Sequence, residues 1–583
     1  MRTTILHRLR GLFRQSPPLE VWYDEAYRLP LPSLEAMAGL DPRRVDLVAW
    51  YLLQTRALKP SQLRTPELAS WEDLHRAHDP AYLESLQTPQ ALAKIFAVDA
   101  REIPVEPLLR FVRLAAGGTI TATRSVLITG GAALNLAGGF HHASRAHGGG
   151  FCAVNDLAAA VKRVRHEGFD GQVCVLDLDA HPPDGIVDCL KDDPKVWVGS
   201  LTASRWEHTG PVDEIVLPAE TGDVPYLRAL GELLGRMPKP ELAFVVSGAD
   251  ILAGDRLGRL GLTLAGARER DHQAFLALEG VPQVWLPGGG YRPDAWRVLA
   301  GTGLVLAGRA HKRIPRSYDP LTRRFHRVSR EMTAASLHGD DWTITEEDIF
   351  GELNAGPPPA PRVLGYYSPS GIEYGLYRQG ILGHVRRMGY ESLRVDVDTV
   401  GTGDRLRLFG TAEGGEHVLI EAILERCRIG GVEALFVNWL TLRNPRIRYT
   451  EGRPLLPGQE VPGLGLAREA TMLLSLIAKR LGLQAVVFRP AWFHLARAGR
   501  SDYRFVDPER QGRFEALCRD TEGVPLAEIS RAVSDGRVLL DGEPYAWEAT
   551  DFAHYLSEPP EDPEWDRRRD AERERVRFEL VSE

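Results

Sequence analysis

Three apolar segments of the chain each lead into side chains that can bind a metal ion or polarise a carbonyl group. These side chains are Asp177, Asp179 and His181 at the end of VCVLDLDAH, Asp250 at the end of FVVSGAD, and Tyr291 after VWLPGGG. A separate glycine-rich turn carries the adjacent pair His141 and His142. Because the carboxyl ends of parallel strands meet at one sheet edge, where ligands bind, we expect these residues to lie close together.

Asp179, His181 and Asp250 have the chemistry of a divalent metal site. Two carboxylates and one neutral imidazole balance the charge of the ion and leave positions open for water and substrate, which is typical of a catalytic zinc site rather than a structural one. Water held by such an ion becomes acidic near neutral pH, and the ion polarises an amide carbonyl. The pattern therefore predicts metal-assisted hydrolysis.

The histidine pair can supply the base that hydrolysis requires, since imidazole titrates near neutral pH. Each ring needs a carboxylate to fix its tautomer, and Asp177 and Asp184 are available. Tyr291 can donate a hydrogen bond to the developing oxyanion from the side opposite the metal. A single Asp at a strand end is more often a turn or capping residue. The joint pattern is what favours catalysis.

The elements that must position these residues are predicted to be strands and crossover helices of a parallel α/β sheet. Strands are predicted at SVLITGG near 125, QVCVLDLD near 172, KVWVGSL near 195, LAFVVSGAD near 242 and VPQVWLPGGG near 281. Helices are predicted at DLAAAVKRVRHEGF, PYLRALGELLGRM and RERDHQAFLALEG, where apolar residues recur at three- and four-residue spacing.

A chain of 583 residues exceeds the roughly 250 to 300 residues that one hydrophobic core supports. We expect a catalytic domain over residues 1–330 and a Pro-rich linker over 331–361, which contains GPPPAP. A second, smaller α/β or α+β domain follows over 362–556. The charged tail, 557–583, is predicted to be a solvated helix or a disordered end.

The composition is that of an ordinary globular protein, with a net charge of −8. This charge gives no indication of specific nucleic-acid binding. Five cysteines without a C-x-x-C pair argue against a disulfide framework and favour a cytoplasmic location. No run approaches the ~20 apolar residues of a membrane span. The oligomeric state is left open.

The motifs GGFHHA, GFCAVND, DLDAH followed by Asp184-Gly185, GADILAGDRLGRLGLT and PGGGY, in this order, resemble the histone deacetylase superfamily. The resemblance covers residues 18 to 310 and is closest to class IV and to bacterial histone-deacetylase-like enzymes. It implies the arginase/deacetylase fold and zinc-dependent hydrolysis of N-acyl-lysine in proteins or peptides. One Zn²⁺ per chain and a structural K⁺ are implied as cofactors, and longer acyl chains than acetyl are implied as possible substrates.

The resemblance also assigns roles to residues. The catalytic and metal residues are the zinc ligands Asp179, His181 and Asp250, the pairs Asp177–His141 and Asp184–His142, with His142 as the general base, and Tyr291 as the oxyanion donor. The substrate residues are Gly150, whose carbonyl would lie near the scissile nitrogen, Phe151, a wall of the acyl-lysine tunnel, and Leu257, where polyamine-selecting members carry an acidic residue. Trp206 and His208 are both candidates for the wall opposite Phe151. The K⁺ site would include Asp177, Ser200 and Leu201.

One departure from the family pattern follows the zinc histidine, where this chain has Pro182-Pro183. Two prolines fix φ and remove two backbone donors, so we expect the loop that carries Asp184 to be displaced and its contact with His142 to be weakened. Three alternatives remain beside the lysine deacylase. They are a catalytically weak acyl-lysine-binding module, an amidohydrolase of acetylpolyamines or other small amides, and an arginase-type ureohydrolase, which would need a second metal.

In the second domain, PGLGLAREATMLLSLIAKRLGL and the segments after it resemble an N-acyltransferase of the GNAT type. Gly463 and Gly465 would form the turn that binds the pyrophosphate of acyl coenzyme A. Glu460 stands where a basic residue or Gln is expected, and its charge would repel phosphate. The alternative is a domain that keeps the fold and presents the substrate.

Overall fold

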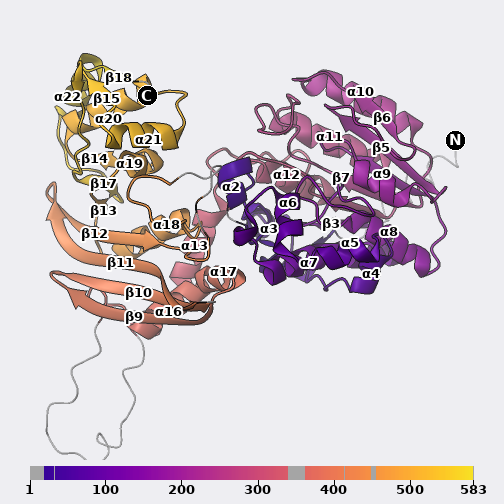
Figure 1. Ribbon diagram of the computed structural model, residues 1–583, viewed down its shortest axis with the longest axis horizontal. Helices are drawn as coiled ribbons and strands as arrows, with labels where there is room; N and C mark the ends of the chain where they lie inside the picture. Colours follow the sequence, from indigo (N-terminus) through magenta and orange to yellow (C-terminus); the bar gives the residue numbers. More distant parts are fainter. Residues whose placement is uncertain are drawn as a thin grey trace, which may run out of the picture. The chain divides into compact units, whose positions relative to one another are not determined.

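The computed structural model describes residues 19–31, 33–338, 362–412, 414–447, 449 and 455–581. Contacts between Cα atoms divide the chain into unit 1, which ends at Leu321, and unit 2, which begins at Thr322 (Figure 1). The predicted linker lies mostly outside the described residues, and the domain boundaries drawn from the sequence stay predictions. Among the described residues, no helix has both the length and the apolar character needed to cross a membrane.

Unit 1 is built on an eight-stranded sheet in which every neighbouring pair is parallel. In spatial order the strands are β2 (Leu63–Arg64), β1 (Glu20–Trp22), β3 (Ala132–Asn135), β8 (Gln283–Leu286), β7 (Leu242–Val246), β4 (Val173–Asp177), β5 (Val196–Thr202) and β6 (Asp213–Val216). Every residue of β4, β7 and β8 is buried. Their apolar runs are continuous because a parallel sheet is covered on both faces.

Helices cover both faces of this sheet. Successive residues of a strand point to opposite faces of the sheet. Leu134 of β3 lies against the position of Gly303. The next residue, Asn135, donates to the carbonyl oxygen of Ala115. Gly303 belongs to α12 (Trp296–Leu306) and Ala115 to α7 (Val105–Thr129), so these helices lie on opposite sides. The remaining helices of unit 1 are α2 (Ser33–Ala38), α3 (Arg44–Gln54), α4 (Trp71–His75), α5 (Pro80–Ser85), α6 (Pro89–Phe96), α8 (Asp156–His166), α9 (Asp184–Leu190), α10 (Asp223–Arg236) and α11 (Leu264–Ala277), with the short 3-10 turns η1 (Glu25–Tyr27), η2 (Pro60–Gln62) and η3 (Ala100–Glu102). The predicted parallel sheet flanked by helices is confirmed.

One predicted strand is wrong. The segment SVLITGG begins within the last turns of α7, and the strand β3 starts only at Ala132. Gly130 ends the helix with a φ of 72°, the left-handed conformation typical of a helix C-terminus. The β-branched residues before it extend the amphipathic pattern of a helix of 25 residues, and this longer pattern overrides their local strand preference.

The strand order brings the chemistry-bearing loops together. Strands β3, β8, β7 and β4 are consecutive in the sheet, although they are far apart in the sequence. All four run in the same direction, so their carboxyl ends meet at one edge. From that edge the chain continues into the turn before His141, into the PGGGY loop, into the loop that ends at Asp250, and into the Asp177–His181 segment.

Unit 2 contains a seven-stranded mixed sheet and a small three-stranded sheet, which confirms a second domain with α/β or α+β character. The large sheet has the order β14 (Arg504–Phe505), β17 (Phe552–Tyr555), β13 (Ala485–Phe488), β12 (Val432–Leu442), β11 (Gly415–Ile429), β10 (Gly403–Ala412) and β9 (Glu391–Val400); the small one has the order β16 (Glu543–Pro544), β15 (Val538–Leu540) and β18 (Phe578–Leu580). The helices are α13 (Pro320–Glu331, which begins at the end of unit 1), α14 (Ala334–His338), α16 (Pro369–Arg378), α17 (Ile381–Arg387), α18 (Ala467–Arg480), α19 (Phe493–Gly499), α20 (Pro508–Asp520), α21 (Leu526–Ser534) and α22 (Trp565–Arg575). Only β12 and β13 are a parallel pair among these strands.

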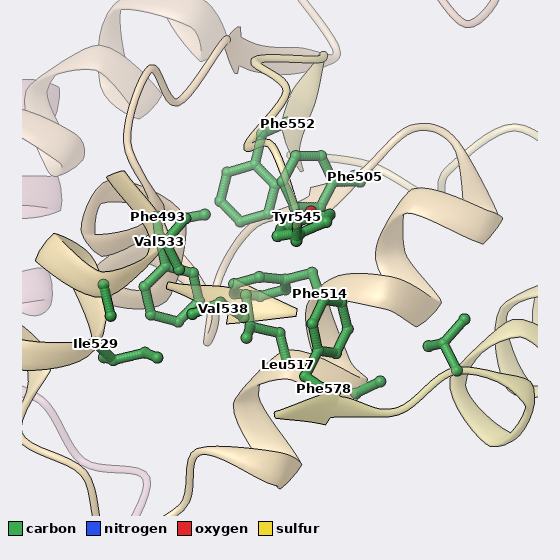
Figure 2. Close-up of a cluster of buried hydrophobic side chains, with 14 of the residues drawn as sticks. Phe493, Phe505, Phe514, Leu517, Ile529, Val533, Val538, Tyr545, Phe552 and Phe578 are labelled. Carbon is green, nitrogen blue, oxygen red and sulfur yellow. The ribbon is translucent and has the colours of Figure 1, made fainter. Parts of the chain in front are cut away.

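The carboxyl-terminal part of unit 2 has an aromatic core. Figure 2 shows Phe493, Phe505, Phe514 and Phe552 directed toward one another. Their ring centroids lie 4.7 to 6.3 Å apart, the spacing of edge-to-face and tilted aromatic packing. The same cluster includes Phe578 of β18.

The charged tail is therefore anchored rather than disordered. Helix α22 forms as predicted, but Trp565 and Val576 are buried and β18 pairs with β15. The apolar anchors Trp565, Val576 and Phe578 are separated by residues that are all charged except Ala571, and this density of charge hides them in a composition-based prediction. The resemblance to an acyltransferase stays a prediction; Gly463 and Gly465 do precede α18, and Glu460 pairs with Arg443.

Candidate active site and metal centre

Asp179, His181 and Asp250 converge as predicted. The His181 Nδ1 atom lies 2.9 Å from the Asp250 Oδ2 atom and 3.1 Å from the Asp179 Oδ1 atom. One ligand atom from each of the three residues falls within 4.8 Å of the other two. Both carboxylates are completely buried. Among the described residues this is the one group of His, Cys, Asp or Glu side chains with such a geometry.

The electrostatics of the triad fit a divalent cation. Burial, together with the neighbouring Asp179, raises the pKa of Asp250. Two ionised carboxylates in a buried site repel each other and lose their hydration. A cation between them removes both costs. Oxygen and imidazole donors in this number are those that zinc and similar ions accept in catalytic sites.

Backbone groups fix the orientation of both carboxylates. The Gly289 N–H donates to the Asp179 Oδ2 atom at 2.6 Å, and the Ala180 N–H donates to the Asp250 Oδ1 atom at 3.1 Å. A Cβ atom at Gly289 would lie 2.7 Å from the Asp250 Oδ2 atom. Only glycine leaves room for this approach, which gives the PGGGY motif a role in packing beside the candidate metal ligands.

Arg270 of α11 connects the two loops that carry the candidate metal ligands Asp179 and Asp250. Its guanidinium donates to the carbonyl oxygens of Leu178 at 3.1 Å and of Gly248 at 2.7 Å. Arg270 is completely buried and pairs with Asp271 at 2.8 Å. A buried charge is retained only with such partners. Arg270 is not predicted from the sequence, although two charged residues on the buried face of RERDHQAFLALEG are a signal for it.

The two histidines each contact the carboxylate predicted for them. The distance from His141 Nδ1 to Asp177 Oδ2 is 3.0 Å, and that from His142 Nδ1 to Asp184 Oδ1 is 2.7 Å. The two rings lie with centroids 4.0 Å apart. In both cases the Nδ1 atom is occupied by the carboxylate, so the Nε2 atom is the one left to act in the site.

The two imidazoles differ in proton affinity. Burial lowers the pKa of His141, but the charges of Asp177 and Asp179 outweigh burial and raise it to about 9. Burial and the neighbouring His141 lower the pKa of His142. At neutral pH the lowered pKa makes His142 a neutral ring that can accept a proton.

The expected displacement of Asp184 by Pro182-Pro183 is wrong. Asp184 keeps its 2.7 Å contact with His142. Pro183 occupies the N-cap position of α9, and Asp184 is the first residue of that helix. At the start of a helix the backbone N–H groups have no partner within the helix, so proline costs nothing there.

The turn that carries the histidines is held by Asp156, which the sequence analysis did not single out. This buried carboxylate accepts hydrogen bonds from the backbone N–H groups of Gly139 at 3.1 Å and Phe140 at 2.8 Å. The Thr119 hydroxyl donates to it at 2.6 Å. Three donors thus stabilise the charge of Asp156. Its hydrogen bonds to Gly139 and Phe140 fix the turn and therefore the position of the histidine pair.

Tyr291 lies beside the metal triad with its side chain buried. The Tyr291 N–H donates to the Asp255 Oδ2 atom at 2.8 Å, which fixes this residue at the end of the glycine-rich loop. Burial, with a contribution from Asp250, raises the pKa of the Tyr291 hydroxyl well above 10. The hydroxyl keeps its proton at neutral pH and remains a hydrogen-bond donor.

Gly150 and Phe151 form a strained segment next to the histidines. Their φ angles are 53° and 65°, in the left-handed region, which is rare for a residue such as Phe and is found at functional sites. A Cβ atom at Gly150 would lie 2.3 Å from the His142 Cδ2 atom. The segment places the Phe151 ring 5.9 Å from that of Tyr291.

Of the two candidates for the opposite wall, Trp206 is the one beside the site. Its ring is stacked on His142 with centroids 5.2 Å apart, and it is 42% exposed. His208 instead contacts Glu214 at 3.3 Å. Leu257 is also 42% exposed, in the loop held by Asp255.

Arg44 is a further residue that the sequence analysis missed. It lines a cavity of about 70 Å³ together with Tyr291, His141 and Gly288, and its Nη2 atom donates to the Gly288 carbonyl at 3.0 Å. Burial lowers the pKa of Arg44, yet an arginine keeps its charge at any physiological pH. It comes from α3, about 100 residues before the first motif, so no spacing indicated it.

The residues of the predicted K⁺ site lie on the neighbouring strands β4 and β5. Ser200 is paired with Asp177 in the register of β4 and β5, and Leu201 is buried behind it. The Ser200 hydroxyl is buried and has no hydrogen-bond partner among the described residues. Such an oxygen would suit a cation, and the K⁺ site stays a prediction.

His78 contacts the segments on either side of the histidine turn and is expected to be a neutral ring. Its Nδ1 atom lies 2.9 Å from the Ser144 carbonyl, to which it donates, and its Nε2 atom accepts from the Asn155 N–H at 2.8 Å. Only a neutral imidazole can accept and donate at once. Burial lowers the pKa of His78 to about 4.

This gives a prediction about pH. Between pH 6.5 and 4 the unfolded chain binds a proton at His78 that the folded chain does not, so the stability of unit 1 falls as the pH falls, at up to about 1.4 kcal/mol per unit. The pKa of His78 is measured by an NMR titration of ¹³C-labelled histidines, with the His78 signal assigned from the His78→Gln spectrum. A midpoint near 6.5 would contradict the neutral ring.

Comparison with known proteins gives consistent matches over this half of the chain. The model of the family described as histone deacetylase domain matches residues 39–302. Histone deacetylase 2 of Arabidopsis thaliana is 30% identical over 298 residues, which cover 48% of this chain and 77% of that protein. An uncharacterized protein from Picosynechococcus is 32% identical over 281 residues, with 46% and 87% covered. The crystal structure of an HDAC homolog from Aquifex aeolicus is 22% identical, with 51% and 86% covered and a TM-score of 0.42.

Proposed function

The chain belongs to the histone deacetylase family, and on that premise we propose that unit 1 is a zinc-dependent hydrolase that removes acyl groups from the side-chain nitrogen of lysine in proteins or peptides. One observation carries this proposal. A three-residue metal triad, two histidine–carboxylate pairs and a buried tyrosine hydroxyl meet at one edge of a parallel sheet.

Asp179, His181 and Asp250 would hold one Zn²⁺, as their donor atoms and buried charge suggest. The ion would supply an acidified water and a polarised amide carbonyl. Gly289 and Ala180 hold Asp179 and Asp250 through the hydrogen bonds described above, and Arg270 holds the two loops that carry these carboxylates. Preorganised ligands avoid a reorganisation cost during the reaction.

His142 would act as the general base. Its Nδ1 atom is held by Asp184, which leaves the Nε2 atom to accept a proton from the attacking water. The lowered pKa of His142 keeps this ring neutral and ready for that step. The same ring would return the proton to the departing lysine nitrogen. His141, whose Nδ1 atom is held by Asp177, would present its Nε2 atom to the same site.

Tyr291 would donate a hydrogen bond to the oxygen that becomes negative when water adds to the carbonyl carbon. Its raised pKa ensures that the proton is present. The bond matters most after the charge has developed, so it lowers the barrier rather than only improving binding. The hydrogen bond from the Tyr291 N–H to Asp255 helps to fix the position of the hydroxyl.

The substrate would enter between aromatic rings. Phe151 and Trp206 offer apolar surfaces for the methylene stem of lysine, with the Gly150 carbonyl near the scissile nitrogen. The cavity beside Tyr291 offers space for the acyl group. Arg44 in its wall would attract the carboxylate product, because a buried guanidinium binds a carboxylate strongly.

Two alternatives lose support. The binding-module hypothesis depended on a displaced Asp184, which instead keeps its contact with His142. An arginase-type enzyme needs a second metal, and the described residues hold one ligand cluster. An amidohydrolase of acetylpolyamines remains a second candidate in principle, but Leu257 has no charge that could attract a second ammonium group. The K⁺ site and the cytoplasmic location remain predictions.

A substrate panel tests the proposal. We expect the zinc-loaded chain to hydrolyse lysine peptides that carry acyl groups between acetyl and myristoyl, with one chain length preferred, and to prefer them over acetylpolyamines because Leu257 is apolar. Loss of the acyl group from each peptide, at equal concentration, is followed by mass spectrometry. Faster turnover of acetylpolyamines would favour the second candidate, and no turnover on any substrate would contradict the enzyme.

A further inference from the structure

Unit 2 contains a cavity of about 130 Å³ between one face of its large sheet and the helices α16 and α18. Its walls are apolar or glycine except for Ser329, Tyr367, Gln379 and Arg480. An engineered apolar cavity of about 150 Å³ in another protein stays dry and binds benzene. This cavity is therefore large enough for a compact organic molecule.

Small residues create the space. Ala422 of β11 lies directly between Leu406 of β10 and Leu440 of β12 in the sheet register, so a small side chain stands between two large ones. On the helix side, a Cβ atom at Gly375 would find its nearest neighbour 3.9 Å away. Leu440 lines the cavity and is 39% exposed, which marks a place where the cavity meets the surface.

One buried polar atom in the wall has no partner. Gln379 is 4% exposed, and its Nε2 atom donates to the Phe325 carbonyl at 3.2 Å. This contact fixes the orientation of the amide and leaves the Oε1 atom buried without a hydrogen bond among the described residues. An unpaired buried acceptor is costly, and native proteins leave few of them.

The wall of the cavity offers few other hydrogen-bonding groups to a polar molecule. A buried water needs two to four polar partners. The guanidinium of Arg480 already donates to the carbonyl oxygens of Met332 and Ser329 at the end of α13, so it serves the fold rather than the cavity. An apolar body with one donor group matches this wall better than water does.

We propose that this cavity is a binding site for a compact, neutral, apolar molecule with a single hydroxyl or N–H donor, which Gln379 accepts through its Oε1 atom. The apolar body would lie over Ala422 and beside Gly375. The site belongs to unit 2 alone and is independent of the deacylase chemistry proposed for unit 1. Arg480 is the one charged side chain among the described residues of its wall, and it is engaged by the carbonyl oxygens of Met332 and Ser329.

Phenol and toluene, which have nearly the same shape, test the site by isothermal titration calorimetry on the full chain. We expect phenol to bind the wild-type chain and to bind the Gln379→Met variant at least about fivefold more weakly, because one hydrogen bond is lost. Methionine keeps the apolar volume, so toluene should bind both proteins within about twofold. Retained toluene binding also shows that the variant still forms the cavity.

The Ala422→Leu variant locates the site. Leucine fills the space between Leu406 and Leu440, so binding of both molecules should be lost while the melting temperature is maintained. If that variant does not fold, Ala470→Leu on α18 fills the cavity from the opposite wall. The proposal is overturned if phenol does not bind the wild-type chain, if Gln379→Met binds phenol equally well, or if a folded filling variant binds both molecules unchanged.

Discussion

Replacing Tyr291 by Phe is expected to lower the turnover of acyl-lysine peptides by roughly 100- to 1,000-fold, because one hydrogen bond to a developing oxyanion is worth about 2.7 to 4 kcal/mol in comparable sites. The substitution removes only the hydroxyl. The buried ring keeps its contact with Phe151, and the backbone N–H keeps its bond to Asp255. Zinc content and the unfolding transition should therefore match those of the wild type.

The kinetic constants separate this role from a structural one. A donor that acts mainly on the transition state lowers kcat with little change in KM. Tyr318→Phe is the matched control, since it removes a hydroxyl that bonds to Gln54 outside the site. Wild-type turnover in the Tyr291→Phe variant, or an equal loss in Tyr318→Phe, would contradict the assignment.

Replacing Asp250 by Ala is expected to abolish stoichiometric zinc binding and, with it, activity. Removal of a hydrogen-bond partner of a metal ligand already costs about 10- to 100-fold in affinity, and removal of a ligand should cost more. The metal-free variant should still fold, because Asp250 is a buried carboxylate whose pKa is raised by burial and by Asp179, so its charge opposes folding.

Metal content by mass spectrometry and folding by circular dichroism are measured on the same sample. Asp213→Ala provides the control, since this carboxylate pairs with Arg236 at the surface. A variant that retains one zinc per chain would show that Asp250 is not a ligand. Loss of zinc in the Asp213→Ala control would show that the assay reports general destabilisation.

Site residues could be predicted from the sequence where they directly follow a buried strand. Asp177, Asp179, His181 and Asp250 were predicted because each follows an apolar run whose direction in a parallel sheet is known. The helix pattern was informative in the same way for α8, α10 and α11. The segment SVLITGG failed because a short β-branched run is compatible with a long helix, and only tertiary packing decides between them.

Residues that act across the fold could not be predicted. Arg44 and Arg270 reach the site from helices α3 and α11, and their target is a backbone carbonyl that has no sequence signature. Trp206 and His208 are two residues apart in a loop, so the choice between them depended on loop geometry. The effect of Pro182-Pro183 depended on where α9 begins, and the sequence did not define that helix start.

We propose that zinc at the Asp179–His181–Asp250 site enables hydrolysis of acyl-lysine. The most direct test of this proposal is the rate of deacylation by the full chain before chelation, after removal of the metal, and after return of one equivalent of Zn²⁺. We expect turnover to disappear with the metal and to return at one zinc per chain, with the Asp250→Ala variant inactive throughout. Turnover that survives complete metal removal, or no turnover of any acyl-lysine peptide by the zinc-loaded chain, would contradict it.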